Sequence, residues 1–156
     1  MKLTDYLTED FIKINFEVNS KEEVIDSLIE IISISPFILD KEKIKHAVWK
    51  REKEMSTGVG NFFAIPHAKT DGVSNIIFSI AILSKEIDFQ SFDSKPVQIV
   101  FLMLCKEELV GLHIKLLSRI SRLMNQEEFR IKLLSAKSTS EVMSIFISAE
   151  TKYFDV

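Results

Sequence analysis

Apolar and polar residues alternate near the N-terminus and then repeat with a helical period. Every second residue of 11–18 is apolar, which predicts a half-buried strand. Ser20 and Glu23 have the spacing of a capping box, and an apolar stripe of helical period follows them. Pro36 ends this helix, and Asp40 is placed to cap a second one that runs past residue 50.

The middle of the chain has the composition of strands. Residues 62–67, FFAIPH, predict a short strand that ends at Pro66, and residues 75–83 are rich in β-branched and aromatic side chains. Residues 96–105, PVQIVFLMLC, are apolar on both faces, which is typical of a central strand buried on both sides.

From Leu109 onward the apolar spacing changes to three or four residues, which predicts helices. Asn125 with Glu128, and Ser138 with Glu141, have capping-box spacing for two further helices. The order is therefore strand, two helices, several strands and three helices. It predicts the α/β class, with a mixed β-sheet sandwiched by helices in a single domain over residues 1–156. Periodicity does not predict the strand order.

Composition limits the function. The chain has 156 residues, 46% hydrophobic, with a formal net charge of −3, so it has no basic surface for nucleic acid. Its apolar runs are shorter than the roughly 20 residues of a membrane helix, and the first residues include acids where a signal peptide is apolar. The single cysteine, Cys105, excludes an internal disulfide. We expect a cytoplasmic protein.

Two of the four glycines lie in the loop STGVGN, residues 56–61. Glycine permits positive φ and close backbone approach, and successive N–H groups in such loops bind anions. No Gly-Lys-Ser/Thr follows, so this is not a P-loop. The loop is a candidate phosphate cradle, with donors from Ser56, Thr57, Gly58, Gly60 and Asn61.

His67 follows Pro66, where we expect strand pairing to end and the imidazole to lie just past the edge of the sheet. Imidazole is nucleophilic at neutral pH because its pKa is about 6.5, so it takes a phosphoryl group without an activating base. The alternative, a hydrogen-bonded structural histidine at a strand end, stays open from spacing alone.

His113 falls in the first turn of the helix after Leu109, where the helix dipole favours its neutral form. Arg51 is a candidate partner for phosphoryl oxygens, because a guanidinium matches their geometry. The alternatives are a histidine at a helix entry and a solvated arginine. We expect His46 on the surface and Cys105 as a buried small hydrophobe, and the three histidines are too far apart in sequence for a metal motif.

The segment REKEMSTGVGNFFAIPHAKTDGV, residues 51–73, resembles enzyme IIA of the bacterial phosphotransferase system, in the fructose/mannitol class that includes nitrogen-regulatory IIA proteins. The resemblance extends over nearly the whole chain. It implies a mixed sheet between helices, with His67 accepting phosphate from the carrier protein HPr or its nitrogen-branch relative. It also implies His113 as the second active-site histidine and an arginine, Arg51, nearby. Phe62 and Phe63 depart from the family pattern, which usually has a small and an aliphatic residue there.

Two functions follow from this resemblance. In the first, the chain is a phosphoryl carrier that passes the group to a IIB component for sugar uptake, with no cofactor or metal because the donor is already activated. In the second, phosphorylation of His67 switches a regulatory module that docks on a transporter, kinase or regulator, since phosphate adds about two negative charges near neutral pH. A scaffold with an inactive site is a third, weaker hypothesis.

Overall fold

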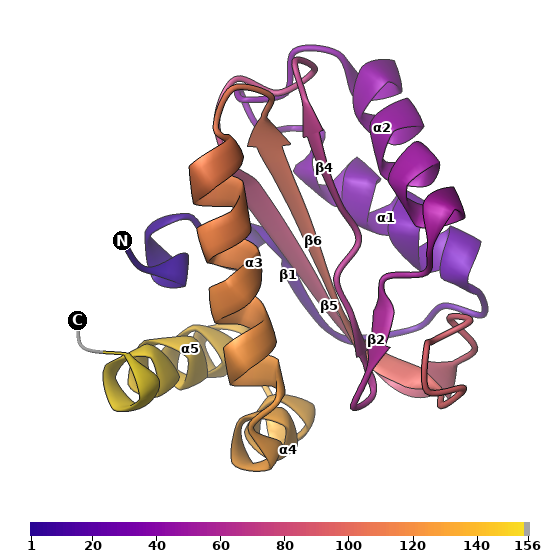
Figure 1. Ribbon diagram of the computed structural model, residues 1–156. Helices are drawn as coiled ribbons and strands as arrows, with labels where there is room; N and C mark the ends of the chain where they lie inside the picture. Colours follow the sequence, from indigo (N-terminus) through magenta and orange to yellow (C-terminus); the bar gives the residue numbers. More distant parts are fainter. Residues whose placement is uncertain (155–156) are drawn as a thin grey trace.

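The computed structural model describes residues 1–154, which form a mixed sheet between two layers of helices (Figure 1). The fold class expected from the sequence is confirmed. The strands are β1 (Ile12–Phe16), β2 (Gly58–Gly60), β3 (Phe63–Ala64), β4 (His67–Thr70), β5 (Ile77–Ile87) and β6 (Val97–Lys106). The α-helices are α1 (Lys21–Ile32), α2 (Lys41–Glu54), α3 (Val110–Met124), α4 (Glu127–Ser135) and α5 (Thr139–Tyr153), with 3-10 turns at Leu3–Asp5 and Glu9–Phe11.

The sheet has the order β1-β5-β6-β3-β2, and β4 also pairs with β6. The strand β6 is antiparallel to β5 and parallel to both β3 and β4. Phe63 pairs with Ile99, and His67 pairs with Met103 in the same register, so β3 and β4 continue one another along β6.

The position of His67 differs from the sequence expectation, because pairing does not end at Pro66. Pro66 has no N–H to donate, but its carbonyl accepts from the N–H of Met103 at 3.0 Å. The ladder therefore resumes at once, and His67 is the first residue of β4. His67 therefore lies within the sheet, at the point where the strand paired with β6 changes from β3 to β4.

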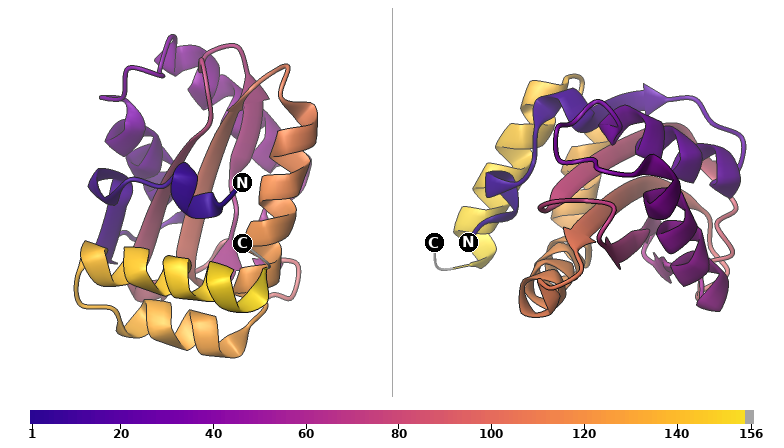
Figure 2. Two further views of the ribbon diagram at one scale, coloured as in Figure 1. Left: turned by 90° about the vertical axis from the view of Figure 1, so that its left-hand side faces the viewer. Right: turned by 90° about the horizontal axis from the view of Figure 1, so that it is seen from above.

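The strand β6 separates two apolar cores, and this accounts for its hydrophobicity on both faces. Val100 and Leu102 pack in the core under α1 and α2, whereas Phe101 and Met103 pack in the core under α3, α4 and α5. Figure 2 shows the two groups of helices on opposite sides of the sheet. Within residues 1–154, no helix combines the length and apolarity needed to cross a membrane.

Three of the four expected helix caps are confirmed. The side chains of Ser20, Asp40 and Ser138 each accept a hydrogen bond from the backbone N–H three residues later. The cap at Asn125 is wrong: Asn125 ends α3, and its side-chain oxygen accepts a hydrogen bond from Asn61 at 2.8 Å. That long-range contact takes the oxygen that the cap would have used.

Candidate functional site

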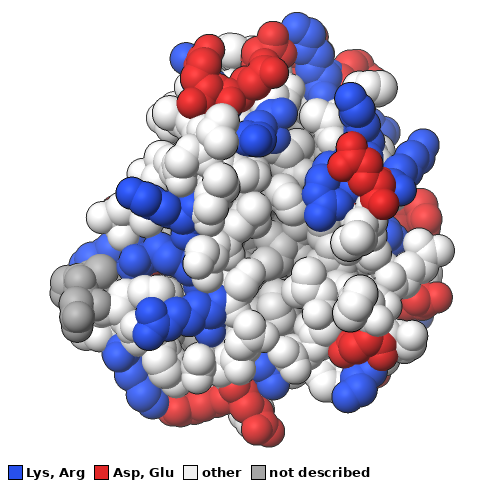
Figure 3. Space-filling view, in the orientation of Figure 1, with Lys and Arg blue, Asp and Glu red and all other residues white. Residues whose placement is uncertain are grey.

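An open groove of about 930 Å³ runs between α2 and α3, with β4 as its floor. His67, His113 and Arg51, the three residues chosen from the sequence, all line it. The two imidazole rings lie 5.4 Å apart, centroid to centroid, with their planes inclined by 51°. Figure 3 shows this face of the molecule hollowed in the middle, with Lys and Arg side chains standing around the hollow.

His67 is oriented by its own backbone. Its Nδ1 lies 2.8 Å from the carbonyl oxygen of Ile65, which can only accept, so Nδ1 carries the proton and donates. The lone pair is then on Nε2. Burial lowers the pKa of His67, and the nearby charge of Arg51 lowers it further, against the hydrogen bond to Ile65, which raises it. The ring is therefore a neutral, partly exposed nucleophile at neutral pH.

His113 lies in the first turn of α3 and is only 5% exposed. Burial, followed by the charges of His67 and Lys69, lowers the pKa of His113 to about 4, so this ring is also neutral near pH 7. Its Nδ1 is buried and has no hydrogen-bond partner within residues 1–154. An N–H there would have no acceptor, so the proton belongs on Nε2, where it can be donated into the groove.

Arg51 lies in the last turn of α2 and reaches the groove from the side opposite α3. Its Nη1 donates to the carbonyl of Met55 at 2.7 Å, which holds the guanidinium at the end of the helix. Within residues 1–154 its other N–H groups donate to no acceptor, which leaves them for an anion at His67. The arrangement thus combines one nucleophilic imidazole, one neutral donor and one fixed cation.

The STGVGN loop, residues 56–61, is not positioned as the sequence predicts. The N–H and hydroxyl of Thr57 donate to the buried carboxylate of Glu52 at 2.9 and 2.6 Å. The hydroxyl of Ser56 donates to the carbonyl of Phe89 at 2.8 Å and accepts from the N–H of Gly58 at 3.1 Å. These donors are used inside the fold, so they do not form a nest for an anion.

The second half of the loop makes the turn between β2 and β3. Gly60, Asn61 and Phe62 all have positive φ, and Asn61 donates to Asn125. Glycine at position 60 is required by its φ of 112°. None of the five predicted cradle residues lines the groove. Gly60 permits the tight antiparallel turn, Gly58 leaves room for Ser91, and the histidines lie elsewhere.

Sequence reasoning missed Lys69, which lines the groove two residues after His67. The alternation of side chains along a strand could have placed Lys69 on the same face as His67. That reasoning requires the strand to continue past Pro66, which was not expected from the sequence. His46 is exposed, as expected, yet it too lines this groove, from α2. Lys43 and Asp71 form an ion pair of 3.4 Å at the groove and partly neutralise each other.

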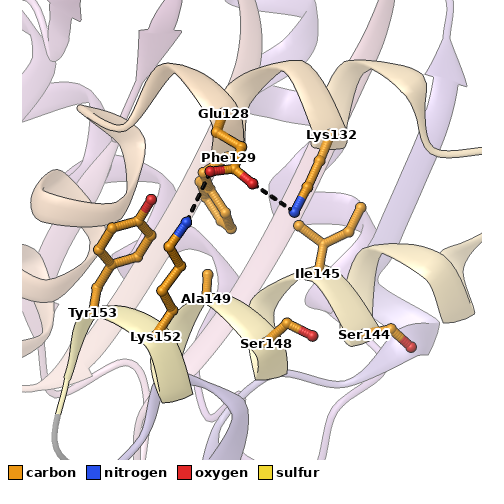
Figure 4. A pocket seen from close by; sticks show the side chains of 9 residues that line it. All are labelled: Glu128, Phe129, Lys132, Ser144, Ile145, Ser148, Ala149, Lys152 and Tyr153. Atoms are coloured by element: carbon orange, nitrogen blue, oxygen red, sulfur yellow. Dashed lines mark hydrogen bonds and ion pairs between the residues drawn. The ribbon is translucent and has the colours of Figure 1, made fainter.

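A second hollow, of about 180 Å³, lies between α4 and α5 (Figure 4). Its cations Lys132 and Lys152 both point to Glu128, at 3.0 and 2.9 Å. Hydrogen bonds from the two lysines lower the pKa of Glu128 to about 2. Since the carboxylate already occupies both ammonium groups, this hollow offers little to an anion, and it contains none of the histidines.

Residues 5–149 match the family model described as "Phosphoenolpyruvate-dependent sugar phosphotransferase system, EIIA 2". The chain is 37% identical over 145 residues to the fructose-specific EIIABC component of Bacillus subtilis, covering 93% of this chain but only 23% of that protein. It is 35% identical over 126 residues to the fructose-specific EIIA component of Haloferax volcanii, with 81% and 82% coverage.

Relatives from the nitrogen branch are similar over their whole length. A nitrogen regulatory protein of Bradyrhizobium diazoefficiens is 32% identical, over 93% of this chain and 94% of its own. The crystal structure of nitrogen regulatory protein IIA-Ntr from Neisseria meningitidis superposes with a TM-score of 0.86 at 28% identity, covering 92% and 98% of the two chains. The chain therefore belongs to the EIIA type 2 family of the phosphoenolpyruvate-dependent sugar phosphotransferase system.

Proposed function

We propose that this chain is a phosphoryl carrier that accepts the phosphoryl group on Nε2 of His67 and passes it to a second protein. The donor is a phosphohistidine carrier protein of the HPr type. One observation carries this proposal: Nδ1 of His67 donates to the carbonyl of Ile65, which leaves Nε2 unprotonated in an open groove beside His113. The residues that perform the reaction in this proposal are His67, His113 and Arg51.

The proposed step exchanges one N–P bond for another. The lone pair on Nε2 of His67 attacks phosphorus in line, the new N–P bond forms, and the bond to the donor imidazole breaks with its electron pair returning to that ring. The Nδ1 proton of His67 stays in its hydrogen bond with Ile65 throughout. Because the bonds made and broken are of the same kind, the transfer is reversible and needs no metal or nucleotide.

The neighbouring groups stabilise the charge of the transferred group. Arg51 supplies a cation, and His113 supplies a neutral N–H from Nε2. A neutral imidazole matters here, because a second cation beside His67 would hold the phosphoryl group too firmly for onward transfer. The open groove lets a partner protein bring its histidine to His67.

The test is transfer from a phosphorylated HPr-type protein to the purified chain. His67→Ala is expected to abolish acid-labile, base-stable labelling, because Nε2 is the acceptor. His113→Ala is expected to accept label but pass it poorly to a IIB protein. His46→Ala is the matched control, since His46 lines the same groove without touching the proposed chemistry. Histidine labelling that persists in His67→Ala would contradict the proposal.

A second candidate is a regulatory module whose binding partner is selected by the phosphorylation state of His67. Its support is the 32% identity to a nitrogen regulatory protein of Bradyrhizobium diazoefficiens, beside the 35% identity to the fructose-specific EIIA component of Haloferax volcanii that supports the first candidate. Rates of transfer from sugar-branch and nitrogen-branch donors separate the two. Faster transfer from the nitrogen-branch donor, together with a regulator recovered only by the unphosphorylated chain, favours the switch over transfer to a IIB acceptor.

A further inference from the structure

Lys69 stands on the same side of β4 as His67. Residues two apart along a strand point to the same face and lie about 6.6 Å apart at their Cα atoms. The intervening Ala68 and the following Thr70 are buried, whereas Lys69 is exposed. The lysine and both active-site histidines line one groove. A flexible four-carbon side chain from this position reaches the space next to the imidazole of His67.

In the part of the chain that the structure describes, the ammonium group of Lys69 has no partner. Within residues 1–154 it takes part in no hydrogen bond or ion pair, whereas the groove cation Lys43 pairs with Asp71 and Arg51 donates to the carbonyl of Met55. An unpaired exposed lysine is ordinary on a protein surface. It is less ordinary in a groove that it shares with two imidazoles, where its charge disfavours protonation of both.

The polar groups that share the inner groove with Lys69 come from three elements. Arg51 lines the groove from α2, His113 lines it from α3, and His67 shares the strand of Lys69. Asp71 follows on the same side of the chain, but its carboxylate is paired with Lys43. Asp40, Glu42 and Glu54 also line the groove, all at α2, whereas β4 and α3 add no acidic side chain to it. A phosphoryl group brings between one and two negative charges near neutral pH.

We propose that Lys69 is a phosphoryl-binding residue, unpaired in the resting protein and ion-paired with the phosphoryl group once it is on His67. This inference rests on the proposed function and adds a cation to it. The phosphoryl group then has a guanidinium on the α2 side, an N–H from His113 on the α3 side and an ammonium on the β4 side. Because the three donors come from different elements, they can approach the three phosphoryl oxygens from different directions.

The test compares Lys69→Gln with Lys69→Arg and with a matched control, Lys50→Gln. Lys50 is an exposed lysine of α2 that lines the same groove, so both Gln variants lose one charge from it. Losing one charge-assisted contact at an open site should shift the equilibrium of phosphoryl transfer from the HPr-type donor about tenfold toward the donor. Lys69→Arg should keep the transfer equilibrium close to that of wild type, and Lys50→Gln should change this equilibrium little.

A spectroscopic measurement separates contact from structure. The 31P resonance of phosphorylated His67 reports protonation of the phosphoryl group, and a nearby ammonium favours the dianion. Lys69→Gln is expected to raise the pKa of that group relative to wild type and Lys50→Gln. Equal phosphoryl pKa values in Lys69→Gln and Lys50→Gln would overturn the assignment of Lys69. If wild type itself gives no phosphohistidine, the proposed function fails instead, so the two failures are distinguishable.

Discussion

Acidification should unfold this protein in part by charging His113. The ring is 5% exposed, and its Nδ1 has no hydrogen-bond partner within the described residues, so the folded protein disfavours the imidazolium. The pKa of His113 is about 4 in the folded state, against 6.5 for the unperturbed group. The perturbation is a change of pH from 7.5 to 4.5, applied to wild type and to His113→Asn.

The direction and size of the change in the free energy of unfolding follow from the linkage between proton binding and folding. Between pH 6.5 and pH 4 the unfolded chain binds a proton on His113 and the folded chain does not, so unfolding becomes more favourable as the pH falls. The stabilisation is complete above the unfolded pKa and is lost as the pH falls toward the folded pKa. A difference of about 2.5 pKa units at about 1.36 kcal/mol each gives about 3 kcal/mol.

The measurement is urea unfolding followed by circular dichroism at several pH values. Wild type should lose about 2.5 kcal/mol more than His113→Asn between pH 7.5 and 4.5, because asparagine keeps a polar group but does not titrate and pH 4.5 is still above the folded pKa. Any constant loss of stability in the variant cancels in this comparison of slopes. Parallel pH profiles of the two proteins would refute the conclusion that His113 is buried neutral.

Two further predictions concern the framework that holds Arg51 and the β2–β3 turn. Glu52→Ala should cost about 3–5 kcal/mol in urea unfolding, because it leaves Lys21 buried without its partner at 2.8 Å. The matched control is Glu30→Ala, whose exposed pair with Lys41 also joins α1 to α2 and should matter little, so equal effects would contradict this account. Gly60→Ala should cost about 1–3 kcal/mol in the same assay, because φ is 112° there; an unchanged midpoint would argue against that backbone conformation.

Much of the fold was accessible from local patterns. Caps at Ser20 and Asp40 depend on residues three apart, and the burial of 96–105 on both faces follows from a run with no polar side. The strand order was not accessible, because β6 pairs with residues as far as 36 positions away in sequence, as Phe63 with Ile99, and periodicity carries no register. The cap at Asn125 failed for a similar reason, since its side chain is taken by Asn61.

For the candidate site too, the sequence indicated some residues but not how they are arranged. The sequence indicated His67, Arg51 and His113, but their meeting in one groove depends on how α2 and α3 cross the sheet. The glycines of residues 56–61 suit a nest and a tight turn equally well. The deciding residue was Glu52, a buried carboxylate that takes the donors of Thr57. Nothing in the spacing of residues 56–61 predicts that Glu52 accepts these hydrogen bonds in place of an anion.

The proposed relay must release what it binds, and the groove is built for contacts of moderate strength. Enclosed charges would hold a phosphoryl group far more tightly, because the interaction energy of a charge pair rises several-fold as the surroundings lose water. Here the groove is open, His113 is a neutral donor, and Arg51 shares its guanidinium with the carbonyl of Met55. Each contact is thereby weakened without being lost. Strengthening them, for instance by making His113 cationic, should slow onward transfer even as it stabilises the phosphorylated protein.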